Sequence, residues 1–167
     1  MKLYDVIVAD PPWRYSFSRS GSRAVENHYS TMTQSEIEAL EVPAKEDAVL
    51  YLWATAPKLP EAISALKAWG FDYKTCAMWD KRRIGMGYWF RGQHELLLVG
   101  KRGSFRPPSA GQRVSSVITE TRRDHSRKPE RVMELIDQWY GDKDRLELFA
   151  RGAPRRGWDA WGDEVSA

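Results

Sequence analysis

Residues that carry metal and redox chemistry are scarce in this sequence of 167 residues. It has one cysteine, Cys76, and three scattered histidines, so it cannot form an internal disulfide or a cysteine-based zinc cluster. No apolar run reaches the roughly 18 residues that a membrane-spanning helix needs, and the first residues resemble a short strand containing Asp5, not a signal peptide. We therefore expect a cytoplasmic protein with no membrane partner and no metal site.

Hydrophobic and aromatic residues, in contrast, are plentiful. Hydrophobic residues make up 42% of the chain and aromatic residues 12%, with eight tryptophans, which is too many for a disordered protein. The length suits one domain with its own core. We expect a single domain over residues 1–167.

The net charge of +3 conceals a strong asymmetry along the chain. Residues 81–128 hold 12 basic and 3 acidic residues, a net charge of +9, whereas the rest holds 14 basic and 20 acidic residues, a net charge of −6. The basic segment also contains Tyr88, Trp89, Phe90 and Phe105. Cations that meet phosphates and rings that stack on bases are typical of a nucleic-acid surface. The alternative is an ordinary solvated face with a few core aromatics.

Apolar patterns predict alternating strands and helices. The expected strands cover residues 4–9, 48–53, 73–79, 95–99, 114–119 and 145–150. The expected helices cover residues 33–40, behind a capping box of Thr33 and Glu36, residues 57–69, and residues 129–140, with Pro129 at the first helical position. This alternation predicts an α/β fold in which helices flank a mostly parallel sheet and ligands bind at the carboxyl ends of the strands.

The strongest chemical motif, Asp10-Pro11-Pro12-Trp13, follows the first expected strand. Asp10 and the carbonyl of Pro11 can each accept one N–H of an exocyclic amine such as that of adenine, while Trp13 can stack on the ring. Two fixed acceptors favour a pyramidal nitrogen whose lone pair can attack an electrophile. The alternative is a rigid turn with Trp13 in the core.

The motif and several blocks after it resemble a known family. The blocks are YDVIVADPPWRY at 4–15, YSTMT at 29–33, LWAT at 52–55, WGF at 69–71, HELLLVG at 94–100, HSRKPE at 125–130 and LELFAR at 146–151. Together they resemble the DPPW adenine N6-methyltransferase family of MT-A type. The resemblance implies a Rossmann-like methyltransferase fold that uses S-adenosyl-L-methionine (SAM), with Asp10, Pro11, Pro12 and Trp13 as the catalytic motif, ahead of the cofactor motif.

The resemblance also implies a set of cofactor contacts. Glu147 accepts the ribose hydroxyls, and Lys128, helped by Ser126 and the amides of the helix after Pro129, holds the methionine carboxylate. The full set of cofactor residues is Asp10, Ser126, Lys128, Glu147, Phe149, Arg151, Gly162, Asp163 and Glu164. Asp163 and Glu164 depart from the amides usual in the family, and carboxylates cannot donate to the ring nitrogens of adenine. An outward-facing strand residue is the alternative for Glu147, and a solvent lysine for Lys128.

Other residues are candidates for contact with the substrate. Tyr29 and Trp79 resemble aromatic residues near the substrate or cofactor, although both can equally be core residues. Glu95 is expected to organise the basic loop by pairing with an arginine, or to form an ordinary salt bridge. Phosphate contacts are expected from arginines of the basic segment, namely Arg82, Arg83, Arg91, Arg106, Arg113, Arg122 and Arg123.

The expected function is therefore methyl transfer from SAM to the N6 amino group of an adenine that has left its stack. DNA is favoured over RNA because the small format resembles bacterial and phage enzymes. The alternatives are an RNA adenosine N6-methyltransferase, a catalytically silent nucleic-acid-binding subunit, and an enzyme that methylates a protein side-chain amide. A homodimer or heterodimer is compatible with the sequence.

Overall fold

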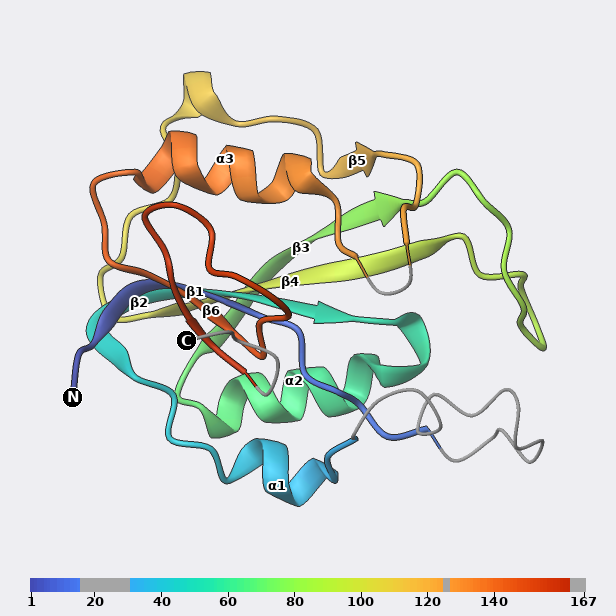
Figure 1. Cartoon of the computed structure of the whole chain (residues 1–167), viewed down its shortest axis with the longest axis horizontal. Helices are drawn as coiled ribbons and strands as arrows, with labels where there is room; N and C mark the ends of the chain where they lie inside the picture. The colour runs from blue at the N-terminus through green and yellow to red at the C-terminus, as the bar shows by residue number, and fades with distance from the viewer. Residues whose placement is uncertain (16–30, 125–126, 163–167) are drawn as a thin grey trace.

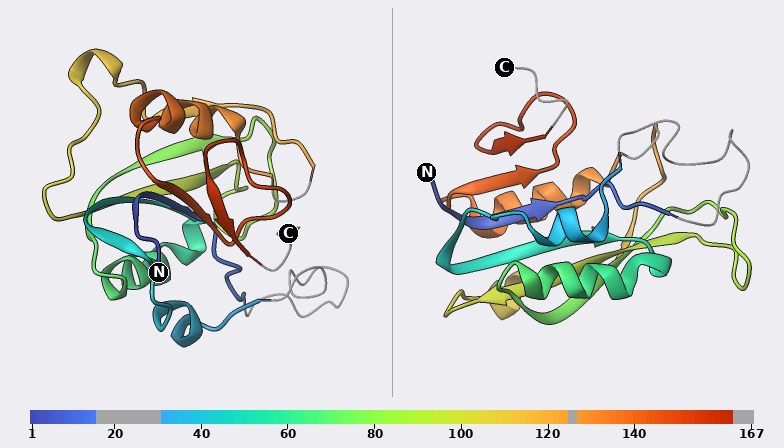
Figure 2. Two further views of the ribbon diagram at one scale, coloured as in Figure 1. Left: turned by 60° about the vertical axis from the view of Figure 1, so that its left-hand side comes forward. Right: turned by 90° about the horizontal axis from the view of Figure 1, so that it is seen from below.

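The computed structural model describes residues 1–15, 31–124 and 127–162 of the chain. Its centre is a seven-stranded sheet with the order β5-β3-β4-β2-β1-β6-β7 (Figures 1 and 2). The strands are β1 (Tyr4–Ala9), β2 (Ala44–Ala54), β3 (Asp72–Asp80), β4 (His94–Arg102), β5 (Val117–Thr119), β6 (Arg145–Leu148) and β7 (Asp159–Trp161). The α-helices are α1 (Gln34–Glu38), α2 (Leu59–Ala68) and α3 (Glu130–Tyr140), with 3₁₀ turns η2 (Ala56–Lys58) and η3 (Ala110–Gln112).

Six of the strands run in one direction. β1 is parallel to both β2 and β6, β6 to β7, and β3 to β5, whereas β4 is antiparallel to β2 and β3. The prediction of an α/β fold with a mostly parallel sheet is confirmed. The carboxyl ends of six strands and the beginning of β4 therefore meet at one edge, which we call the carboxyl edge.

Helices cover both faces of this sheet, with α3 on one face and α1 and α2 on the other (Figure 1). Ile7 and Ala9 of β1 pack in the cluster that contains α1 and α2. Val6 and Val8 point to the opposite face and pack in the cluster that contains α3. Because successive strand residues face opposite sides, the continuous apolar run of β1 is what a strand covered on both faces requires.

The local signals in the sequence explain where the helices begin and end. Thr33 and Glu36 form the predicted capping box of α1, and Gly70, with φ +81°, follows the end of α2. The predicted helix 57–69 is divided into η2 and α2. Pro60, which has no N–H, lies where the regular helix begins. Pro129 was predicted at the first helical position of α3. It is instead the N-cap, and the helix begins at Glu130.

Three strand assignments differ from the prediction. The predicted strand 145–150 ends at Leu148, because the backbone of Phe149 turns into a left-handed conformation. Only Val117–Thr119 of the predicted strand 114–119 pairs with the sheet. β7 was not predicted, because its three residues lack a detectable period. Within the described ranges, every helix is too short or too polar to cross a membrane.

Candidate active site

The loop after β1 carries Asp10 to the middle of the carboxyl edge, because β1 lies between β2 and β6. The backbone N–H of Asp10 still donates to the carbonyl of Leu148 at 3.4 Å. Pro11 and Pro12 then end the ladder, since proline has no N–H to give. The side chain of Asp10 is 27% exposed, so a ligand can reach its carboxylate.

The side chain of Trp13 anchors this loop in the hydrophobic core. Its indole is 6% exposed and lies in the core, and its Nε1–H donates to the carbonyl of Trp53 at 3.1 Å. This placement agrees with the core alternative and does not present Trp13 as a stacking face. The carbonyl of Pro11 accepts the backbone N–H of Trp13 at 2.8 Å, which leaves one oxygen lone pair for a ligand.

Asp10 lies at one end of a series of alternating charges. The ammonium of Lys128 lies 3.4 Å from Oδ2 of Asp10 and 2.9 Å from Oε2 of Glu95. The other oxygen of Glu95 lies 3.5 Å from Nζ of Lys81. Lys128 also stands over the ring of Trp53, 5.6 Å from its centroid. Asp10, Lys128, Glu95 and Lys81 thus form one connected network, which we call the charge chain.

Burial and ion pairing shift the pKa values of the groups in this network in different directions. Burial raises the pKa of Asp10, and the ammonium of Lys128 only partly opposes the shift. Burial alone would lower the pKa of Lys128, but Asp10 and Glu95 raise it overall. Burial would raise the pKa of Glu95, yet Lys128 and Lys81 lower it. Glu95 is thus the firmly ionised partner, and Asp10 is the carboxylate that accepts a proton more readily than usual.

Glu147 of β6 lies close enough to Asp10 for the two charges to interact. Burial raises the pKa of Glu147, and the carboxylate of Asp10 raises it further. No hydrogen bond to the Glu147 carboxylate is present among the residues described. A half-buried carboxylate with free acceptors suits the hydroxyls of a ribose.

The chain after β6 turns sharply beside Glu147. Phe149 has φ +64°, a left-handed conformation that is uncommon for a residue with a side chain. The N–H of Ala150 donates to the carbonyl of Trp161 at 2.9 Å, and a Cβ at Gly162 would collide with the backbone of Ala150. Arg151 is exposed, and its charge acts on Asp10. Phe149, Arg151 and Gly162, which the resemblance assigns to the cofactor site, thus follow β6 or β7 at the same edge of the sheet as Asp10.

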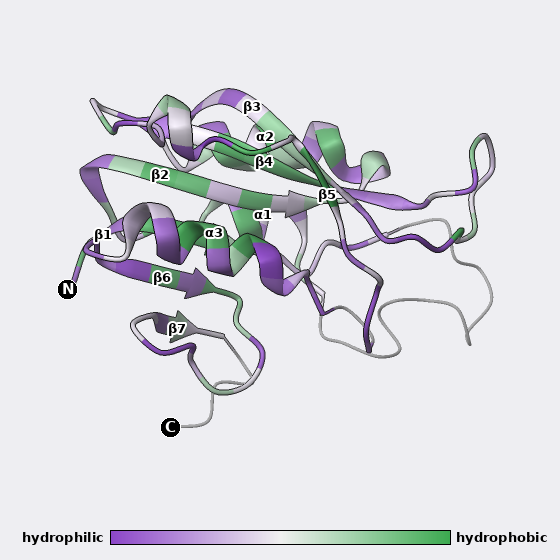
Figure 3. Cartoon of the chain, turned by 90° about the horizontal axis from the view of Figure 1, so that it is seen from above, coloured by the Kyte–Doolittle hydropathy of each residue, from purple (hydrophilic) through white to green (hydrophobic). Residues whose placement is uncertain are grey.

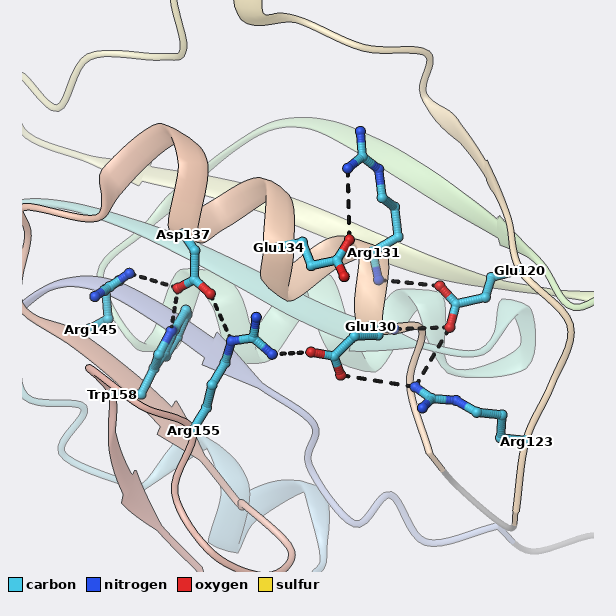
Figure 4. Close-up of polar contacts among 9 residues, drawn as sticks. All are labelled: Glu120, Arg123, Glu130, Arg131, Glu134, Asp137, Arg145, Arg155 and Trp158. Atoms are coloured by element: carbon cyan, nitrogen blue, oxygen red, sulfur yellow. Dashed lines mark hydrogen bonds and ion pairs between the residues drawn. The ribbon is translucent and has the colours of Figure 1, made fainter.

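The N-terminus of α3 is capped by a carboxylate of the protein itself. The backbone N–H groups of Glu130 and Arg131 donate to the two oxygens of Glu120 at 3.0 and 3.2 Å (Figure 4). The N–H of Val132 donates to the carbonyl of Pro129 at 3.3 Å. The prediction that these amides help to hold a cofactor carboxylate needs correction, because Glu120 occupies them. The ammonium of Lys128 has three N–H groups. Two can be directed at Asp10 and Glu95, which leaves one for a ligand.

Two further predictions take a different form in the structure. Glu95 pairs with the two lysines described above, not with an arginine. Trp79 is 3% exposed, its Nε1–H donates to the carbonyl of Glu120 at 2.8 Å, and it meets the ring of Trp53 edge to face. Trp79 is therefore a core residue, the alternative left open by the sequence.

The structure separates the candidate arginines into two groups, all of them exposed. Arg106 and Arg113 belong to the loop between β4 and β5 and lie by the carboxyl end of α3, where the carbonyl of Arg106 accepts from Tyr140. The others lie on the side of Asp10, where the N–H of Arg122 donates to the carbonyl of Lys81. This second group is Arg82, Arg83, Arg91, Arg122 and Arg123.

Some predicted residues lie outside the described ranges, and some residues of the site escaped prediction. Tyr29, Ser126, Asp163 and Glu164 are outside the residues that the structure describes. Lys81 was not singled out, although its place directly after a strand was a usable signal. Glu120 caps a helix that begins ten residues later in the sequence, and no local pattern indicates such a distant cap.

In the described ranges, no group of three His, Cys, Asp or Glu side chains could hold a metal ion.

Comparison with known proteins places this site in a family context. A family model described as MT-A70 matches residues 4–164. The type II methyltransferase M.MunI of a Mycoplasma species is 34% identical to the chain, over 98% of this chain and 78% of its own.

Longer eukaryotic proteins match as well. An N(6)-adenosine-methyltransferase MT-A70-like protein of Arabidopsis thaliana is 28% identical over 98% of this chain. The N(6)-adenosine-methyltransferase catalytic subunit METTL3 of Homo sapiens is 27% identical over 89% of this chain. The chain spans only 24% and 26% of these two proteins.

Proposed function

The chain belongs to the MT-A70 family, and from this premise we propose that it transfers a methyl group to the N6 amino group of adenine in DNA. The family membership makes it a SAM-dependent adenine N6-methyltransferase. The observation that carries the proposal for this chain is the position of Asp10, a reachable carboxylate at the centre of the carboxyl edge whose pKa is raised by burial.

Asp10 and Pro11 would receive the amine. One N–H of the adenine amino group would donate to the carboxylate of Asp10 and the other to the free lone pair of the Pro11 carbonyl. The amino nitrogen must lose one proton when it gains a methyl group. A carboxylate with a raised pKa accepts that proton more readily than an ordinary one. The ammonium of Lys128, 3.4 Å from Asp10, favours the ionised carboxylate and opposes part of the rise in its pKa.

The residues around Asp10 suit the methyl donor. Glu147, with free acceptors, would hold the ribose hydroxyls, and the remaining N–H of Lys128 would meet the methionine carboxylate. When bound, SAM supplies an electrophilic methyl group. The ion pair between Asp10 and Lys128 would then connect the residue that receives the adenine amine with the residue that holds the cofactor.

DNA is preferred to RNA because of how much of each relative the chain spans. It covers 78% of a protein named as a type II methyltransferase, but about a quarter of the N(6)-adenosine-methyltransferases described above. An assembly of two chains and a cytoplasmic location remain predictions from the sequence.

A label-transfer assay tests this function. The purified protein is incubated with methyl-labelled SAM and, separately, with duplex DNA, single-stranded DNA, RNA and a protein extract, followed by nucleoside analysis. Label in N6-methyladenine from DNA supports the proposal. The same product from RNA alone changes the substrate, and SAM binding without label in any sample indicates a silent subunit that needs a partner.

A further inference from the structure

Three large aromatic side chains stand in solvent at the end of the loop that joins β3 to β4. Tyr88, Trp89 and Phe90 are 93%, 96% and 90% exposed, and we call them the aromatic tip. Ile84 and Met86 of the same loop are also exposed. A contiguous apolar group of this kind marks a binding surface in a soluble protein. Figure 3 shows the loop extending from the sheet, with hydrophilic and hydrophobic residues mixed along it.

The loop that carries the tip is internally braced. The N–H of Gly85 donates to the carbonyl of Gly92 at 2.7 Å, and Nε of Arg91 donates back to the carbonyl of Gly85 at 2.8 Å. A side chain at Gly87 would collide with the carbonyl of Phe90, so the turn needs glycine there. The backbone beneath the tip therefore has a defined shape, which lowers the entropy lost when the rings bind a partner.

The base of the loop is joined to the charge chain. The N–H of Lys81 donates to the carbonyl of Gln93 at 2.9 Å, which closes the loop at its base. The carboxylate of Asp80 accepts both the N–H of Arg82 and the side-chain amide of Gln93. Lys81 then pairs with Glu95, and Glu95 with Lys128 beside Asp10. The loop leaves the sheet at the carboxyl edge (Figure 1), so the tip extends from the side on which Asp10 lies.

The charge of the loop selects one class of partner. Residues 81–93 contain four basic residues and no acidic residue. A polyphosphate chain complements such a loop, whereas the same loop of a second copy would repel it. Exposed rings among cations are the combination by which proteins bind single-stranded nucleic acid: the cations follow the phosphates and the rings stack on unpaired bases.

We propose that the aromatic tip is a stacking platform for unpaired bases of the nucleic-acid substrate, next to the adenine that enters the site at Asp10. This inference rests on the proposed function for its substrate class. The tip supplies contacts to base faces, and Arg82 and Arg83 supply contacts to phosphates. Since every base has a face on which a ring can stack, the platform adds affinity without reading sequence.

Fluorescence anisotropy of a labelled single-stranded DNA oligonucleotide, without SAM, tests the proposal. The variant combines Tyr88→Ala, Trp89→Ala and Phe90→Ala. We expect it to bind the oligonucleotide at least about tenfold more weakly, given the contribution of stacking per base. A second probe of the same length contains abasic sugar phosphates. The wild-type protein should prefer the probe with bases, and the variant should bind both probes equally.

Tyr73→Ala is the matched control, because Tyr73 is 42% exposed and lies on β3 away from the tip. It should leave both affinities unchanged. Equal binding of the base-containing probe by wild type and triple variant overturns the proposal, as does an equal loss on both probes. Loss of self-association in the variant, with DNA binding intact, would instead identify a protein interface and overturn it too.

The outcomes separate this inference from the proposed function. Binding of DNA through the tip without any methyl transfer refutes the proposed function and leaves the platform in place. Methylation of adenine by the wild type together with unchanged DNA binding by the triple variant refutes the platform alone.

Discussion

At the scale of single residues, Asp10 combines exposure to a ligand with a pKa above its ordinary value of 3.8. We predict that Asp10→Asn lowers kcat by about 100-fold or more, because the amide cannot take the proton that the amine loses. The affinity for SAM should change by less than about threefold, since Lys128 and Glu147 remain. Single-turnover kinetics and calorimetric titration with SAM measure the two effects separately. Equal losses in both would give Asp10 a binding role only.

The raised pKa of Asp10 also predicts a pH profile. Only the ionised form accepts the amine, so activity should fall as the pH drops through the pKa of Asp10, above the ordinary value of 3.8. Lys128→Met removes the cation that keeps Asp10 ionised and should move this acid limb to a higher pH. The profile of kcat/KM for both proteins checks the prediction. An unchanged limb in the variant would show that another group controls it.

Glu95 should contribute to stability in a pH-dependent way. Its pKa is lowered, so its ion pairs stabilise the folded state above its ordinary pKa of 4.5, and this stabilisation is lost as the pH falls through its folded pKa. We predict that Glu95→Gln lowers the free energy of unfolding by about 2 kcal/mol at neutral pH. Urea denaturation at neutral pH and near pH 3 measures it, and the difference between the two proteins should shrink at acid pH.

At the scale of elements, one carboxylate of α3 holds the C-terminal segment against the helix. Asp137 accepts hydrogen bonds from Arg145 at 2.6 Å, from Arg155 at 2.7 Å and from Nε1 of Trp158 at 2.7 Å (Figure 4). Arg155 also pairs with Glu130. The side chain of Arg145 is only 9% exposed, so it depends on this partner.

Asp137→Ala should therefore destabilise the protein by about 3 kcal/mol, because it leaves the guanidinium of Arg145 buried without a counter-ion. Thermal or urea unfolding measures this change. Lys143→Ala is the control, since its pair with Asp142 is exposed and should contribute less than about 0.5 kcal/mol. Similar losses in both variants would contradict the special role of Asp137.

The elements also show which signals in a sequence can be used. The capping box at Thr33, the proline before α3 and Gly70 after α2 act within a few residues, so the helices could be predicted. The cap that Glu120 supplies to α3 connects separate elements through space. Such a contact depends on how β5 and α3 pack, which no local pattern encodes.

At the scale of the whole molecule, strand order creates the candidate site. Asp10 follows β1, Glu95 is the second residue of β4 and Lys128 precedes α3, so residues far apart in the sequence meet. The motif Asp10-Pro11-Pro12-Trp13 could be recognised in the sequence, whereas the charge chain could not. It exists because β4 runs antiparallel, which brings the start of that strand to the edge where its neighbours end.

The same architecture predicts that the location of a charge, not only its sign, controls binding of DNA. Arg82→Ala with Arg83→Ala should reduce the dependence of log K on log salt concentration for duplex DNA by about 2, near 0.9 for each lost phosphate contact. Arg106→Ala with Arg113→Ala removes the same charge near the carboxyl end of α3 and should leave the slope unchanged. Binding titrations across a salt series decide between them. Equal slopes for both pairs would show that net charge alone, not the carboxyl edge, holds DNA.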